Sequence, residues 1–109
     1  MGIKAMIVSL SEKQLPYIPA PTATPAYSRS ELSAGILHFG VGNFHRAHQA
    51  VYLNTLFNNG RDRDWAIIGA GVMPADEQMR KRLASQDFLT AVVEQSAAKS
   101  ACTVTGPMI

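Results

Sequence analysis

The stretch that decides the fold is GILHFGVGNFHRAHQAVYL, residues 35–53. It begins with a short apolar run, 35–40, which ends in glycine and is typical of a strand buried on both faces. After Gly40 and Gly42, residues 43–58 contain neither glycine nor proline and are long enough for a helix. The sequence therefore predicts a strand, a glycine turn and a helix in direct succession.

The rest of the chain continues this alternation. A second buried strand is predicted at 65–72 (WAIIGAGV), and a helix at 73–86, where Pro74 suits the first turn. Two strand-like segments, 88–95 and 101–106, follow as a hairpin or as neighbours. This order predicts an α/β protein with a partial Rossmann-like dinucleotide-binding fold, in which a mostly parallel sheet is followed by a C-terminal strand pair.

Composition limits the class of protein. The chain has 109 residues, 47% of them hydrophobic and 17% charged, with a formal net charge of +2, which is the profile of one globular domain. Its basic residues are scattered except at 80–82, so nucleic acid is not an expected partner. The single cysteine excludes an internal disulfide and a cysteine-based metal site. No apolar run reaches the length of a membrane span or signal-peptide core, so we expect a cytoplasmic protein with no membrane contact.

The two ends of the chain differ from its middle. Residues 16–25 hold four of the six prolines and predict an extended segment, so we divide the chain into a proline-rich N-terminal arm, 1–31, and part of a dinucleotide-binding domain, 32–109. The sequence stops at TGPMI, directly after a strand, without a helix to cover the other sheet face. We therefore expect a piece of a longer protein whose substrate domain is absent, with an apolar sheet face prone to association.

The glycine turn is the first candidate site. At a junction between strand and helix, Gly40 permits a tight turn and Gly42 lets a pyrophosphate approach the backbone. His45 occupies the place of the third glycine of the G-x-G-x-x-G pattern. A turn without any ligand is the alternative, and Arg46 either pairs with a phosphate or braces the start of the helix.

The histidines allow other interpretations. His45 and His48 are three residues apart, a spacing that two ligands of one metal can have, but a third ligand with recognisable spacing is missing. We expect them instead to hydrogen-bond near the turn or to line the mouth of the cofactor site. His38, within the predicted strand, is interpreted as a hydrogen-bonded core residue.

Charged residues after the second strand bear on the cofactor. Asp76 is the first acid after that strand and either binds the adenosine ribose or supplies negative charge at the helix start. Arg80, Lys81 and Arg82 either meet a 2′-phosphate or form a solvated helix face.

GVGNFHRAHQ and, independently, ADEQMRKRLASQD give the chain a family resemblance over residues 32–109. The region resembles the N-terminal part of the mannitol dehydrogenase family, the long-chain polyol dehydrogenases that include fructuronate reductase. This resemblance implies hydride transfer between NAD or NADP and a polyol or keto-sugar, without a metal. It also implies that Asp76 lies at the adenosine ribose, which favours NAD, and that the cofactor turn comprises Gly40, Val41, Gly42, Asn43 and Phe44, joined by Arg46.

The resemblance also implies what these residues lack. In the family, a lysine that transfers the proton, with an asparagine and a histidine, lies in a mostly helical domain further along the chain. Lys99, His45 and His48 do not inherit those roles, so this segment alone is predicted to be inactive. A noncatalytic nucleotide-binding or interaction module is the main alternative, and a hydrolase with a metal on His45 and His48 is the second. The sequence leaves the oligomeric state open.

Overall fold

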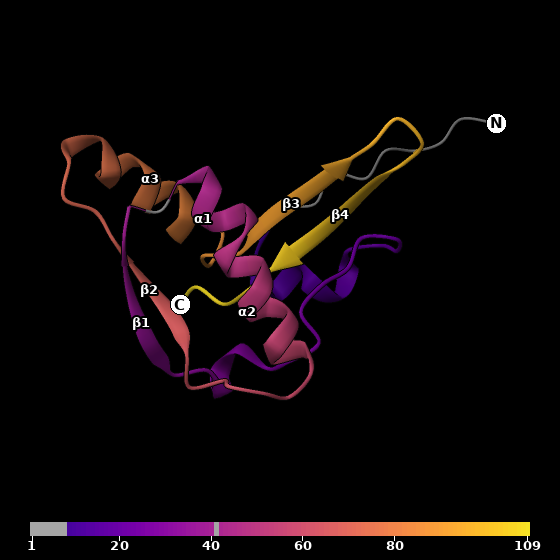
Figure 1. Cartoon of the computed structure of the whole chain (residues 1–109), viewed down its shortest axis with the longest axis horizontal. Coiled ribbons are helices and arrows are strands. Elements are labelled where there is room, and N and C mark those ends of the chain that lie inside the picture. The colour runs from indigo at the N-terminus through magenta and orange to yellow at the C-terminus, as the bar shows by residue number, and fades with distance from the viewer. Residues whose placement is uncertain (1–8, 41) are drawn as a thin grey trace.

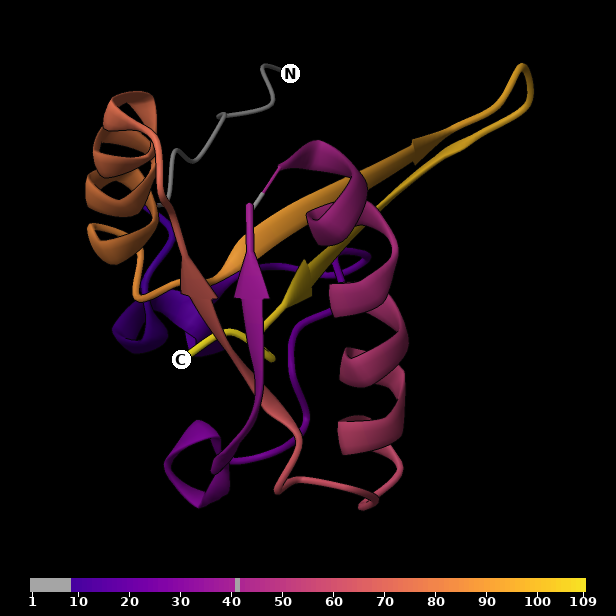
Figure 2. The same ribbon diagram turned by 60° about the vertical axis from the view of Figure 1, so that its left-hand side comes forward.

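Two parallel strands form the centre of the fold. The computed structural model describes residues 9–40 and 42–109, and its elements are shown in Figure 1. β1, Ala34–Phe39, pairs in parallel with β2, Ala66–Ala70, in a register that sets Leu37 opposite Ile68. Figure 2 shows the two strands side by side with their arrowheads pointing the same way. The predicted parallel pair is confirmed.

The connection between these strands contains two helices instead of the one predicted over 43–58. α1 spans Asn43–Ala47 and α2 spans Gln49–Asn58. His48 separates them, because its φ of −122° and ψ of −73° are not helical. The prediction of a continuous helix was therefore wrong at one residue, where the chain changes direction between two short helices.

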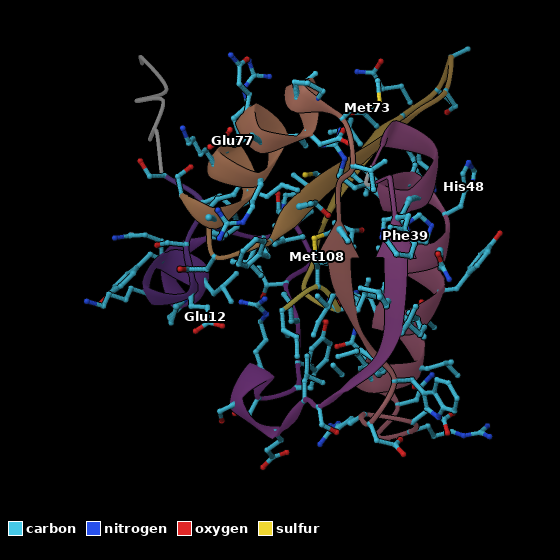
Figure 3. The ribbon with its side chains drawn as sticks, turned by 90° about the vertical axis from the view of Figure 1, so that its left-hand side faces the viewer. Glu12, Phe39, His48, Met73, Glu77 and Met108 are labelled. Atoms are coloured by element: carbon cyan, nitrogen blue, oxygen red, sulfur yellow. The ribbon has the colours of Figure 1, made fainter. Side chains whose placement is uncertain are left out.

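Only one face of the parallel pair is covered by helices. α1 and α2 lie behind β1 and β2 in Figure 3, and the face turned toward the viewer carries Phe39. Leu37, Phe39 and Ile68 are 60%, 63% and 45% exposed. The prediction of a strand buried on both faces was wrong for β1, because the described residues supply helices to one side only.

α3 spans Pro74–Ala84 and follows β2 directly. Pro74 occupies the first helical turn, and acidic residues precede basic ones along the helix, as suits the helix dipole. The helix ends two residues before the predicted 86, because the chain reverses after it: Asp87 and Phe88 adopt φ of 55° and 59°, and the Phe88 N–H donates to the carbonyl of Leu83 at 2.8 Å.

The predicted strand pair is an antiparallel hairpin with a sheet of its own. β3, Thr90–Gln95, pairs with β4, Ser100–Thr105, and the hairpin projects from the body of the molecule in Figures 1 and 2. After the hairpin, Met108 forms a parallel bridge with Ile67. Ile67 donates to the carbonyl of Pro107 and accepts from the N–H of Ile109, both at 2.9 Å. Residues 107–109 thus occupy the edge of β2 opposite β1.

The N-terminal segment packs on the fold more closely than an extended arm would. It contains two short 3₁₀ helices, η1 at Glu12–Tyr17 and η2 at Arg29–Glu31. Between them, Ala23 bridges Thr103, and its backbone makes hydrogen bonds to Cys102 at 3.1 Å and Val104 at 2.8 Å. The prediction of an extended segment over 16–25 was wrong at its start, because η1 covers residues 16 and 17, whereas at Ala23 the backbone pairs with β4 as a strand does. The division of the chain at residue 31 stays a prediction.

One apolar cluster joins this segment to the strands and α2. Tyr27, Leu32, Phe57 and Ala66 are buried together, and the Tyr27 and Phe57 rings meet edge to face with centroids 5.5 Å apart.

Within the described residues, 9–40 and 42–109, no helix is long and apolar enough to cross a membrane.

Candidate functional site

The glycine turn leaves β1 at the carboxyl end of the parallel pair. Gly40 has a φ of +81°, a conformation that side chains disfavour, and its N–H donates to the carbonyl of Ala70 at 2.9 Å. The Gly42 N–H donates to the Gly40 carbonyl, and the Arg46 N–H donates to the Gly42 carbonyl, both at 3.1 Å. These bonds tie the turn to the end of β2 on one side and to α1 on the other. Val41, which we assigned to the cofactor turn, lies outside the described residues.

Open space surrounds the turn where a ligand would have to approach. A Cβ atom built on Gly40 or Gly42 meets no atom within 4 Å. For Gly40 the positive φ still requires glycine, whereas no neighbouring atom requires one at Gly42. The lack of a side chain at Gly42 therefore leaves the backbone accessible rather than solving a packing problem.

The remaining predicted residues of the turn lie at the start of α1. Asn43 and Phe44 are its first two residues. The half-buried Arg46 directs its Nε toward the carbonyl of Gly42, at 3.4 Å. The structure thus brings this guanidinium to the glycine turn, where both interpretations of Arg46 placed it.

Asp76 lies at the end of β2 and fixes the start of α3. Its Oδ2 accepts hydrogen bonds from the backbone N–H groups of Val72 at 3.0 Å and Met73 at 2.8 Å. A Cβ on Gly71 would come within 2.2 Å of the Asp76 Cβ, so Gly71 is needed for this close approach. The helix-start interpretation of Asp76 is therefore present in the structure, in the form of a capping carboxylate.

Beside Asp76 lies a cavity of about 540 Å³, within the size range of small-molecule sites. The cavity opens between the carboxyl end of β2 and α3. Its walls are mostly apolar, with charged groups at one side; they include Ile68, Met79, Leu83, Phe88 and Met108, with Asp76, Glu77 and Arg80. No pattern in the sequence predicted this cavity. The spacing of Met79 and Leu83 along α3 was a usable signal, whereas Phe88 and Met108 reach the cavity only through the fold.

The three histidines occupy different surroundings. The His38 and His45 rings stack, with centroids 3.9 Å apart and planes inclined by 29°. His45 is 4% exposed, and its Nδ1 lies 2.9 Å from Oε1 of Gln49. Burial lowers the pKa of His45, and the neighbouring His38 and Arg46 act in the same direction, against the hydrogen bond to Gln49. His48 is exposed and points outward in Figure 3.

Two interpretations of these histidines need correction. His38 was expected to be a hydrogen-bonded core residue, but its Nδ1 is buried without a hydrogen-bond partner in the described structure, and the residue is only partly buried. His45 and His48 were expected together, near the turn or at the mouth of the cofactor site, but His45 is buried and His48 is exposed, with the helix broken at His48. Within the described ranges, no three His, Cys, Asp or Glu side chains gather as metal ligands do.

Of the three basic residues on α3, Arg80 lines the cavity. Lys81 pairs with Glu77 at 3.5 Å on the exposed surface. The interpretation of these residues as a solvated helix face thus fits Lys81, whereas Arg80 also belongs to the cavity wall.

The description "Mannitol dehydrogenase Rossmann domain" belongs to a family model that matches residues 34–108. The chain belongs to this family. Its α/β fold, with a parallel pair followed by an antiparallel pair, is the Rossmann domain that the sequence predicted.

Relatives with established names agree. The chain is 54% identical over 85 residues to a mannitol 2-dehydrogenase of Cereibacter sphaeroides, a match covering 78% of this chain and 18% of the relative. It is 48% identical over 105 residues to the Pyricularia oryzae mannitol 2-dehydrogenase, covering 93% of this chain and 21% of the relative. The chain therefore spans about a fifth of the length of these relatives.

Solved structures give the same result. A Pseudomonas fluorescens mannitol 2-dehydrogenase in a ternary complex with NAD and D-mannitol matches 92% of this chain and 21% of its own, with a TM-score of 0.87 and 36% identity. A D-sorbitol dehydrogenase in substrate-free form matches 91% of this chain and 21% of its own, with a TM-score of 0.79 and 32% identity.

Proposed function

We propose that this chain is the cofactor-binding segment of an oxidoreductase that transfers a hydride between NAD and a polyol or keto-sugar. The observation that carries the proposal is the arrangement at the carboxyl end of the parallel strands. There the accessible glycine turn follows β1, and the apolar cavity beside the Asp76 carboxylate lies at the end of the neighbouring strand, β2. Ligands of open α/β sheets bind at this edge.

In this proposal, Gly40, Gly42 and Arg46 receive the pyrophosphate. Gly40 provides the turn, and Gly42 lets a phosphate come close to the backbone because nothing occupies the space a Cβ would fill. The Arg46 guanidinium, within reach of the Gly42 carbonyl, supplies positive charge beside the same backbone. We include Val41, Asn43 and Phe44 in this turn because of the family resemblance alone.

Asp76 and the cavity are proposed to hold the adenosine part. The apolar walls suit an adenine ring, and a carboxylate that already accepts two backbone hydrogen bonds is fixed in position for a ribose hydroxyl. A 2′-phosphate would bring negative charge next to Asp76, so we propose NAD as the preferred cofactor and NADP as the weaker one. Arg80 is the residue that would moderate this preference.

The substrate is proposed to be a polyol such as mannitol, or the corresponding keto-sugar, because the relatives are mannitol 2-dehydrogenases. The bound nicotinamide would supply or accept the hydride. We assign no catalytic residue among those described here, and we propose that this segment alone binds cofactor without turning over substrate. A location in the cytoplasm remains part of this proposal.

Calorimetric titration of the folded chain with NAD tests the proposal, with Gly42→Val as the decisive variant. A Cβ atom at Gly42 meets no neighbouring atom within 4 Å, so a valine side chain there extends into the open approach to the backbone. We expect it to reduce NAD affinity at least tenfold, while the midpoint of urea unfolding stays near that of the wild type.

Ala98→Val, a comparable enlargement in the exposed turn of the distant hairpin, is the matched control and should leave affinity unchanged. Unaltered binding by Gly42→Val would remove the glycine turn from the site. A folded wild-type chain that binds no NAD at millimolar concentration would favour the interaction-module alternative.

A further inference from the structure

The stacked pair formed by His38 and His45 spans the glycine turn. His38 is the last residue but one of β1, and His45 is the third residue of α1. Their rings are 3.9 Å apart between centroids. The pair therefore connects the strand that enters the turn to the helix that leaves it.

Both rings carry a buried nitrogen with no hydrogen-bond partner. These atoms are Nδ1 of His38 and Nε2 of His45, in the part of the chain that the structure describes. The other nitrogen of His45, Nδ1, is hydrogen-bonded to the amide oxygen of Gln49, so it carries the proton of the neutral ring. Its Nε2 is then an unprotonated lone pair, which tolerates burial better than an N–H group of an imidazolium.

Among the described residues that pack against His45, no buried acidic side chain balances a positive charge on its ring. The nearest electrostatic neighbours of His45 are His38 and Arg46, and both disfavour its charged form. β2 contributes no ionisable residue, and those of α2 and β3, which pack against α1, are Tyr52 and Glu94, both exposed. Because burial also lowers the pKa of His45, the packed arrangement favours a neutral His45 ring.

We propose that His38 and His45 are positioning residues whose stacked rings hold the glycine turn in its binding conformation only while the His45 ring is neutral, so that mild acid releases the turn and weakens cofactor binding. The reference to cofactor rests on the function proposed above. A proton on His45 forces its ring out of the stack toward water. Because the backbone of the next residue, Arg46, is bonded to the Gly42 carbonyl at 3.1 Å, this movement displaces Gly42.

Nuclear magnetic resonance of the whole chain between about pH 7.5 and about pH 4.5 tests the proposal without any ligand; the range extends well below the ordinary histidine pKa because burial lowers the pKa of His45. We expect the backbone amide signals of Gly40 and Gly42 to shift with the same midpoint as the His45 imidazole. In His45→Phe, which keeps a flat ring in the stack but cannot take up a proton, these amide shifts should disappear. His48→Phe is the control, because it removes an exposed histidine of the same helical region, and it should leave them intact.

Calorimetric titration with NAD at the two pH values measures the consequence for binding. Release of one proton-linked ring lowers affinity by up to about tenfold for each pH unit below the pKa of His45, which burial places below the ordinary histidine range, so affinity should be lower at the acid pH. His45→Phe should lose most of this pH dependence, and His48→Phe should retain it.

Amide signals of Gly40 and Gly42 that ignore the titration of His45 would overturn the proposal, as would His45→Phe amides that shift as in the wild type. If the wild type binds no NAD at either pH, the cofactor proposal fails, and the amide titration still decides whether the pair holds the turn. If His45→Phe does not fold, His45→Gln, which keeps a polar side chain but takes up no proton, must abolish the same shifts.

Discussion

Removal of the Tyr27 side chain should separate the contribution of a buried polar network from that of an apolar core. Tyr27 is 6% exposed, and its hydroxyl donates to Oδ1 of Asn54 at 2.5 Å. The Gly106 N–H lies 3.2 Å from both the Tyr27 hydroxyl oxygen and Oδ1 of Asn54. The ring packs edge to face on Phe57, which is fully buried. One side chain thus connects the N-terminal segment to α2 and to the end of β4.

The two halves of this side chain predict different losses. In Tyr27→Phe the ring remains and Asn54 still accepts from Gly106, so the lost hydrogen bond should cost about 1 kcal/mol. Tyr27→Ala also removes the buried ring, and core substitutions of aromatic residues by alanine cost about 3 to 5 kcal/mol. Since domains of this size are stable by about 5 to 15 kcal/mol, the alanine variant should be close to unfolding.

Urea unfolding, followed by far-ultraviolet circular dichroism and by the fluorescence of the single tryptophan, Trp65, measures these losses. The matched control is Tyr17, which is 67% exposed in η1; Tyr17→Phe and Tyr17→Ala should stay within about 0.5 kcal/mol of the wild type. The reasoning fails if Tyr27→Ala is no more destabilising than Tyr17→Ala. Such a result would mean that the segment before residue 32 is not part of the core.

Three further predictions concern the same elements. Burial raises the pKa of Tyr27 to about 12 from 10.0, so the folded state holds this proton more tightly than the unfolded state does. The free energy of unfolding should therefore fall as the pH rises from 10 to 12, and it should fall less in Tyr27→Phe; urea midpoints measure both. Gly35→Ala should cost about 1 to 3 kcal/mol in thermal or urea unfolding, because its Cβ would lie 2.4 Å from the carbonyl oxygen of Asp64, and an unchanged midpoint would contradict this. Asp76→Asn keeps an oxygen that can cap α3 but loses the negative charge, so the ratio of NAD affinity to NADP affinity should fall. A ratio equal to that of the wild type in titrations with both cofactors would contradict this.

The order of elements could be predicted from the sequence because local chemistry specifies it. Apolar runs, glycine positions and the proline at the start of α3 each have a local physical meaning, and all pointed to the same alternation. The same holds for Gly40, whose positive φ only a glycine adopts readily. The location of Asp76 at a helix start also follows from its sequence position alone.

Features that depend on contacts between distant segments could not be predicted in this way. Asn54 is a polar residue that is only 3% exposed, and its hydrogen-bond partners, Tyr27 and Gly106, lie 27 and 52 residues away in the sequence. In the same way, only the fold reveals that the ring of His45 stacks on that of His38. A helical pattern identifies the face of a residue but not the polar groups that other segments bring to it.

The parallel pairing of β1 and β2 explains how one edge of the fold acquires both halves of the candidate site. Because Gly40 donates to the carbonyl of Ala70, the turn that follows β1 is fixed beside the residues that lead into α3, thirty positions later. The opposite edge of β2 is held by residues 107–109. The carbonyls of Gly106 and Met108 accept hydrogen bonds from the buried guanidinium of Arg29. Arg29 belongs to the segment that the sequence suggested was only an arm. The N-terminal segment therefore supports one wall of the cavity through Met108, although none of its described residues, 9–31, lines the cavity itself.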